Sequence, residues 1–171
     1  MSRSSSSHPL SADALAREIE SQLGDAWLSR IYSERILKMR TRSFEFPSIN
    51  KSSSPQIQHT LLGIELKVSR RRVLCPDLAT ARYLAVFARI GCKAVAIPYD
   101  ITKVSWAADE LERSWHRMLL LADQSAAERT TAFRARLRGL LIGKVRSEIV
   151  KAGAGERMPE FREINKRRDL R

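Results

Sequence analysis

The stretch that decides the fold reads CPDLATARYLAVFARIGCKAVAIPYD and runs from Cys75 to Asp100. Pro76 and Asp77 are typical of a helix start, and Gly91 is typical of a helix end. Residues 93–97 show little alternation of apolar and polar side chains, which indicates a strand buried on both faces. Because residues 72–75 form a short strand before the helix, the order strand, helix, strand predicts a right-handed parallel crossover.

On the N-terminal side, the sequence predicts a helix and two further strands. Ser11 can cap a helix that ends near Tyr32, since apolar residues recur there at spacings of four: Leu15, Ile19, Leu23 and Trp27. Residues 35–42 alternate apolar and basic side chains, which predicts a half-buried strand with a basic outer face. A second strand is expected over residues 57–68, and a turn at residues 69–71 leads back into residues 72–75.

On the C-terminal side, two helices are expected. The first covers about residues 102–122 and carries a continuous apolar stripe. The second starts at Ser125, where Glu128 completes a capping box, and it ends near Gly153. The predicted fold class is therefore α+β, with a small mixed sheet of about four strands in the order helix, three strands, helix, strand, and two C-terminal helices. We expect a disordered arm over residues 1–10, one domain over 11–152 and a basic flexible tail over 153–171.

The chain is strongly basic, and its charge is unevenly placed. Its 171 residues carry a net charge of +12: residues 30–72 and residues 125–171 each supply +7, residues 73–124 are neutral, and residues 1–29 carry −2. Because clustered cations attract polyanions, the leading prediction is a non-enzymatic protein that binds RNA or DNA through a basic surface. We expect the two basic segments to form one surface, with these candidate binding residues: Lys38, Arg40, Arg42, Arg70, Arg71, Arg72, Arg134, Arg138, Lys166, Arg167 and Arg168.

The composition argues against several other classes. Cys75 and Cys92 are too few for a disulfide framework or a zinc site, so we expect no metal and no cofactor. No apolar run approaches the length of a membrane span, and residues 1–9 lack the apolar core of a secretory signal. The predicted location is the cytoplasm. An adaptor that docks an acidic protein through the last helix and tail is a further alternative, and the oligomeric state stays open.

One tripeptide has a catalytic alternative. Glu65-Leu66-Lys67 places a carboxylate and an ammonium side by side on one strand face, and with its surrounding elements it resembles the PD-(D/E)XK nuclease superfamily. This resemblance implies a metal-dependent nuclease with Glu65 and Lys67 as catalytic residues. Residues 46–64, however, contain no Asp or Glu to supply the superfamily's upstream acid. We therefore predict that Glu65 is not catalytic and instead forms an exposed ion pair with Lys38, Arg40 or Arg42.

A second resemblance concerns the central unit. Residues 75–84 (CPDLATARYL), residues 98–102 (PYDIT) and residues 112–121 are similar to small uncharacterised proteins encoded in cyanobacterial genomes. This resemblance implies a family signature without a known activity. It makes five residues candidates for a ligand site at strand ends: Asp77, Arg82, Tyr83, Tyr99 and Asp100. The alternative is that Asp77 and Asp100 cap helices.

Overall fold

The computed structural model describes residues 9–47 and 54–155 of the chain. It confirms the α+β class. The elements are α1 (Ala12–Leu23), the 3₁₀ turn η1 (Gly24–Ala26), α2 (Leu28–Ile31), the π-helical η2 (Tyr32–Ile36), β1 (Thr41–Glu45), β2 (Gln56–Thr60), β3 (Gly63–Val68), β4 (Arg71–Cys75), α3 (Leu78–Ile90), β5 (Ala94–Pro98), α4 (Ile101–Ser125) and α5 (Thr131–Ala152). Within these residues, none of the helices is long and apolar enough to cross a lipid bilayer.

The strands form two antiparallel sheets, so the predicted single mixed sheet and the parallel crossover are wrong. One sheet pairs β1 with β5, from Thr41 opposite Pro98 to Glu45 opposite Ala94. The other is the meander β2–β3–β4. The crossover was expected because β4, α3 and β5 follow each other in the chain. In the structure α3 instead connects the two sheets, because β5 has a more distant partner in β1.

The inner edge of β5 is closed by two tyrosine hydroxyls. Tyr32 Oη accepts a hydrogen bond from the backbone nitrogen of Ala96 at 3.0 Å, and Tyr83 Oη donates one to the Ala96 carbonyl oxygen at 2.5 Å. Both tyrosines are buried. Since buried backbone groups need hydrogen-bond partners, these two hydroxyls take the place of a third strand beside β5.

The segment over residues 35–40 is helical or turn, which corrects the predicted strand over 35–42. The chain continues from α2 into η2, where Tyr32 and Ile36 are fully buried. β1 begins only at Thr41. Lys38 and Arg40 therefore lie before the strand, and only Arg42 lies on it. The alternation that suggested a strand contains only two apolar residues, Leu37 and Met39, and this weak signal does not outweigh the burial of Tyr32 and Ile36 in the helical segment.

The predicted strand over residues 57–68 is a hairpin. β2 ends at Thr60, Leu61 and Leu62 form the turn, and Gly63 opens β3 with a φ of +125°. That backbone conformation strongly favours glycine. The apolar pattern continued through the turn because Leu61 and Leu62 fill positions that polar residues usually occupy.

The helix ends agree better with the capping signals in the sequence than the strand ends agree with the apolar pattern. The side chains of Ser11 and Asp77 cap α1 and α3, as expected, and Gly91 ends α3 with a φ of +90°. α4 is also confirmed. The predicted start of the last helix at Ser125 is wrong, because Ser125 is the final residue of α4 and the Thr130 side chain caps α5. The predicted end of the first helix near Tyr32 is also wrong, because α1 ends at Leu23 with Gly24 as its C-cap, before η1 and the short α2.

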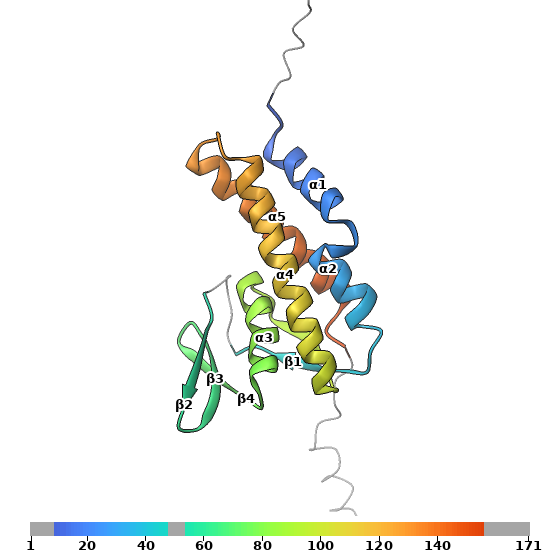
Figure 1. The fold of residues 1–171 in the computed structure, drawn as a ribbon, viewed down its shortest axis with the longest axis vertical. Coiled ribbons are helices and arrows are strands. Elements are labelled where there is room, and N and C mark those ends of the chain that lie inside the picture. The colour runs from blue at the N-terminus through green and yellow to red at the C-terminus, as the bar shows by residue number, and fades with distance from the viewer. Residues whose placement is uncertain (1–8, 48–53, 156–171) are drawn as a thin grey trace, which may run out of the picture.

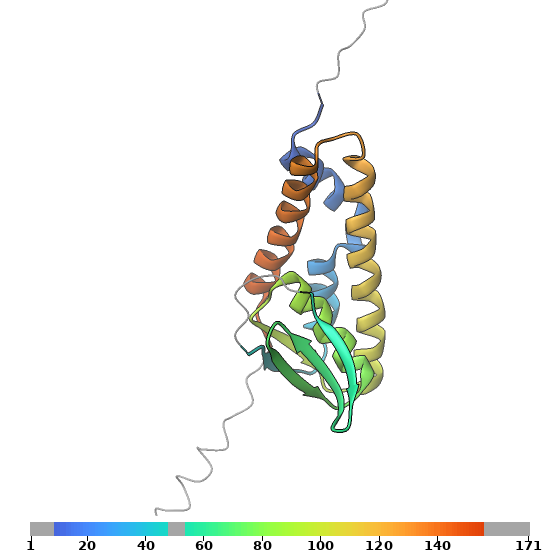
Figure 2. The same ribbon diagram turned by 90° about the vertical axis from the view of Figure 1, so that its left-hand side faces the viewer.

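The helices α1, α4 and α5 lie along the long axis of the molecule, and the β2–β4 sheet lies at one end of it (Figure 1). α3 packs on α4 and contacts all three strands of that sheet. α5 is attached to the first part of the chain: Trp27 Nε1 donates to Glu148 at 2.8 Å, Tyr32 Oη donates to the Gly153 carbonyl at 2.5 Å, and Lys144 forms an ion pair with Glu20. Figure 2 shows α5 descending from the far end of the molecule towards the sheets.

Candidate nucleic-acid interface

The β2–β4 sheet concentrates positive charge. Residues 54–75 contain Lys67 and three consecutive arginines, Arg70 to Arg72, and their single acid is Glu65. The arginines are exposed. They begin in the turn between β3 and β4, where Ser69 adopts a φ of +54° so that two residues reverse the chain. The turn therefore presents three guanidinium groups at one edge of the sheet.

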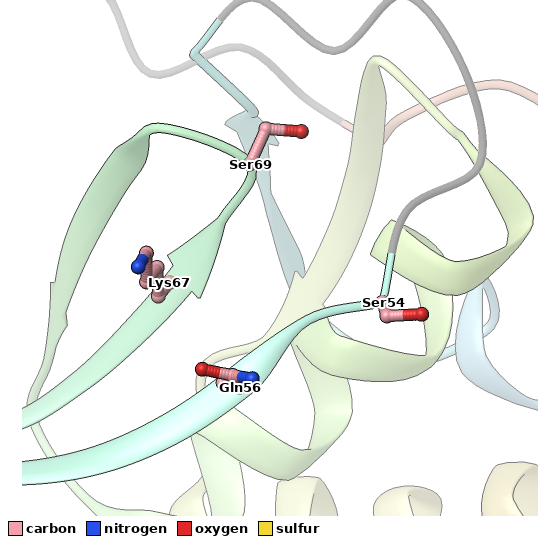
Figure 3. A pocket seen from close by; sticks show the side chains of 4 residues that line it. All are labelled: Ser54, Gln56, Lys67 and Ser69. Atoms are coloured by element: carbon pink, nitrogen blue, oxygen red, sulfur yellow. The ribbon is translucent and has the colours of Figure 1, made fainter.

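A shallow polar hollow of about 230 Å³ lies beside this turn, between Ser54 and Gln56 of the β2 side and Lys67 and Ser69 of the β3 side (Figure 3). The β-sheet register explains the grouping, because Lys67 lies opposite Gln56 on one neighbouring strand and opposite Arg72 on the other. The lining offers hydroxyl, amide and ammonium donors. Such a set suits the oxygen atoms of an anion.

Glu65 is engaged with the same strand pair. It is only 6 % exposed, and its Oε2 lies 3.7 Å from Nη1 of Arg72 while accepting no hydrogen bond. The prediction that Glu65 pairs with Lys38, Arg40 or Arg42 is wrong, because β4 and β2 flank β3 whereas β1 belongs to the other sheet. The prediction that the pair is exposed is also wrong for the carboxylate.

The other candidate cations of the first basic segment, Lys38, Arg40 and Arg42, lie on the two-stranded sheet or just before it. The backbone of Arg40 accepts a hydrogen bond from the Tyr99 nitrogen at 3.1 Å, and its guanidinium stands 5.1 Å from the centre of the Tyr99 ring. Lys38 precedes it in an exposed turn, and Arg42 lies opposite Ile97 on β1. These three cations therefore belong to a different surface from Arg70 to Arg72.

Two candidate cations of the second basic segment lie farther away. Arg134 and Arg138 belong to the first turns of α5, which starts at the end of the molecule opposite the β2–β4 sheet (Figures 1 and 2). Arg138 also pairs with both carboxylate oxygens of Asp123 at 2.8 Å. The expected single surface is thus divided along the long axis. Lys166, Arg167 and Arg168 lie outside the described residues.

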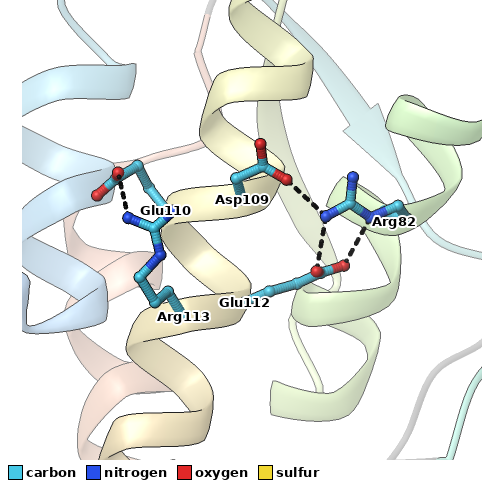
Figure 4. A network of polar contacts seen from close by, with 5 residues as sticks. All are labelled: Arg82, Asp109, Glu110, Glu112 and Arg113. Carbon is cyan, nitrogen blue, oxygen red and sulfur yellow. Dashed lines mark hydrogen bonds and ion pairs between the residues drawn. The ribbon is translucent and has the colours of Figure 1, made fainter.

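The five residues of the expected ligand site have separate structural partners. Asp77 and Asp100 cap α3 and α4, and buried Tyr83 bonds to Ala96. Arg82 bonds to Glu112 and Asp109 on α4, at 2.7 Å in both cases (Figure 4). The hydrogen bonds that this guanidinium donates, first to Glu112 and then to Asp109, raise its pKa. The alternative interpretation, helix capping, is what the structure shows for the two aspartates.

The sulfur atoms and acids do not gather into a metal site. Cys75 and Cys92 are both buried, and burial raises the pKa of the Cys92 thiol to about 12. In the described part of the chain, no three His, Cys, Asp or Glu side chains come close enough to hold a metal ion.

Sequence reasoning missed Ser54, Gln56 and Ser69 as members of the hollow. The only available signal was the register that places Gln56 beside Lys67, and the unrecognised hairpin concealed it. No protein-family model, curated protein or solved structure matches this chain.

Proposed function

We propose that this protein binds the phosphate backbone of RNA or DNA through its β2–β4 sheet and carries out no chemistry on it. The observation that supports the proposal most is the polar hollow at Lys67 beside the exposed arginines of the β3–β4 turn. A phosphate in the hollow would meet the Lys67 ammonium and two serine hydroxyls. The arginines would contact the neighbouring phosphates, since guanidinium groups suit that anion well.

Binding of this kind depends on charge and hardly on base sequence. The Lys67 ammonium and the two serine hydroxyls of the hollow suit phosphate oxygens, whereas readout of bases needs several side chains that reach base edges. Each neutralised phosphate releases counterions, so the affinity should fall steeply with salt. We place this activity in the cytoplasm, since buried free cysteines suit a reducing compartment.

We assign no catalytic role to Glu65 and Lys67. The Glu65 carboxylate is buried next to Arg72, and a guanidinium at that distance repels a divalent cation. A metal-dependent nuclease holds its metal with several oxygen ligands. A cleavage assay with magnesium or manganese on RNA and DNA tests this point: cutting that disappears in both Glu65→Ala and Lys67→Ala would establish the nuclease instead.

The binding proposal is tested by fluorescence anisotropy with labelled single-stranded RNA, single-stranded DNA and duplex DNA. The double variant Arg70→Ala/Arg71→Ala should bind at least about tenfold more weakly, and the slope of log affinity against log salt should fall by about 1.5–2. The matched control is Arg17→Ala/Arg117→Ala, which removes the same charge from exposed positions on α1 and α4. Equal losses in both variants would show that total charge matters and the sheet does not. Wild-type affinity that is flat in salt would contradict the proposal.

A further inference from the structure

Exposed apolar side chains concentrate at one end of the molecule. In the described residues ten large apolar side chains are exposed, and six of them belong to the β2–β3 turn, the end of β4 and the starts of α3 and α4: Leu61, Leu62, Leu74, Leu78, Tyr99 and Ile101. These segments lie together at one end of the long axis (Figures 1 and 2). We call this the hairpin end. Exposed apolar residues are ordinary when scattered, but a group of this kind marks a contact surface.

The centre of the group is the turn between β2 and β3. Leu61 is fully exposed and Leu62 is 76 % exposed, and they are consecutive residues at the tip of the hairpin. Leu74 extends the apolar surface, because its Cδ1 lies 3.7 Å from the position that a Cβ at Gly63 would occupy. Polar residues would serve this turn better in water. The two leucines therefore project from the fold without contributing to its core.

Three exposed cations lie at or near the Tyr99 part of the apolar group, beside the start of α4. Lys103 is exposed in the first turn of α4, and Arg40 stands over Tyr99, which precedes that helix. Lys38 is exposed two residues before Arg40, and none of the three forms an ion pair with a described acid. The acids Asp77 and Asp100 lie at the same end as the caps of α3 and α4, where the positive ends of the helix dipoles offset their charge.

We propose that the hairpin end docks onto the surface of an anionic lipid bilayer. Leu61 and Leu62 enter the interface between headgroups and acyl chains, and Lys38, Arg40 and Lys103 lie against the headgroup phosphates. Apolar burial and charge attraction act together in this arrangement, since neither two leucines nor three cations alone give stable attachment. A second copy of the chain would also cover the leucines, but it would place like charges opposite each other.

This surface is separate from the proposed phosphate-binding hollow. Arg70 to Arg72 begin at the β3–β4 turn, which is the opposite end of the meander from Leu61 and Leu62. The two proposals can therefore fail independently. The vesicle experiment uses full-length protein freed of nucleic acid by nuclease treatment and a high-salt wash.

The test is co-sedimentation with vesicles of phosphatidylcholine alone and of equal parts phosphatidylcholine and phosphatidylglycerol. Wild-type protein should bind the anionic vesicles and release them at high salt. Leu61→Ser/Leu62→Ser should weaken binding at least about tenfold. Lys38→Gln/Lys103→Gln should also weaken binding to the anionic vesicles, and it should leave the weak association with phosphatidylcholine alone unchanged. The matched control Leu120→Ser/Val150→Ser changes two exposed apolar residues on α4 and α5 and should bind as wild type.

Three results would overturn the proposal. The first is wild-type protein that stays in the supernatant with anionic vesicles. The second is equal binding by the wild type and Leu61→Ser/Leu62→Ser, with circular dichroism showing that both are folded. The third is a wild-type dimer in light scattering that the same double variant converts to a monomer, because the leucines would then be covered by a second copy.

Discussion

The sequence pattern predicted the strand position of Glu65 correctly but predicted its exposure to solvent wrongly. Alternation along residues 64–68 correctly put Glu65 on the face opposite to Leu66 and Val68. The pattern also implied that this face is open to solvent, but Glu65 is buried. The exposure of a strand residue depends on the neighbouring strands. Predicting that Glu65 is buried would have required knowing that β2 and β4 flank β3 and that Arg72 lies on β4.

Because Glu65 is buried, removal of its partner Arg72 should lower the stability of the fold. Arg72→Ala leaves a buried carboxylate oxygen with neither an ion pair nor a hydrogen bond, so it should lower the free energy of unfolding by about 1–3 kcal/mol. Arg71→Ala, its exposed neighbour, should stay within about 0.5 kcal/mol of wild type. Replacing both partners in Glu65→Met/Arg72→Met should restore most of the loss. Urea unfolding measures all three variants, and an Arg72→Ala protein as stable as Arg71→Ala would show that the pair is unimportant.

At the scale of elements, local chemistry predicted helices well and strands poorly. Helix signals depend on residues that are close together in the sequence. Examples are the caps Ser11 and Asp77, the terminating Gly91, and the apolar stripe of α4, whose neighbouring members are separated by about one turn. The strand errors arose where long-range contacts decide the structure. The start of β1 depends on burial of Tyr32 against β5, and the antiparallel pairing of β5 depends on a strand about 50 residues earlier.

The cap of α4 also predicts a pH dependence. Hydrogen bonds from the Thr102 side chain and backbone lower the pKa of Asp100. A lowered pKa in the folded state means that the ionised carboxylate stabilises the fold above the unfolded pKa, and this stabilisation is lost as the pH falls through the folded pKa. Asp100→Asn should therefore melt below wild type at neutral pH, and the two melting temperatures should converge as the pH falls below about 4. A gap that stays constant with pH would show that the charge contributes nothing.

At the scale of the whole molecule, the fold depends on contacts between residues 12–36 and the last helix. Trp27, Tyr32 and Glu20 all bond to residues of α5 or just after it. Such contacts leave no local pattern in the sequence. The polar hollow and the hairpin end could not be predicted either, because the unrecognised β2–β3 hairpin concealed which residues lie side by side, although Arg70 to Arg72 were recognised as candidate binding residues.

Tyr32 connects three parts of the molecule and should make its stability sensitive to alkali. Burial raises the pKa of Tyr32 to about 12, and burial also raises that of Tyr83. Because the unfolded tyrosines ionise near pH 10, the folded state should lose stability as the pH rises from about 10 to 12. Tyr32→Phe should be less stable at neutral pH, since it removes two hydrogen bonds, and should show a shallower alkaline decline. Thermal melts from pH 8 to about 12 measure both effects, and parallel curves for the two proteins would contradict this role.

The pairing of β1 with β5 also determines when each sheet can form during synthesis. The β2–β4 meander joins neighbours in the chain, so its hairpins can close within microseconds once residues 54–75 are available. β1 must wait for Pro98 to be made, and closing the intervening loop then carries a greater entropic cost. On a ribosome, the strand with Arg42 and Phe44 would therefore remain unpaired and open to chaperones long after the meander is complete.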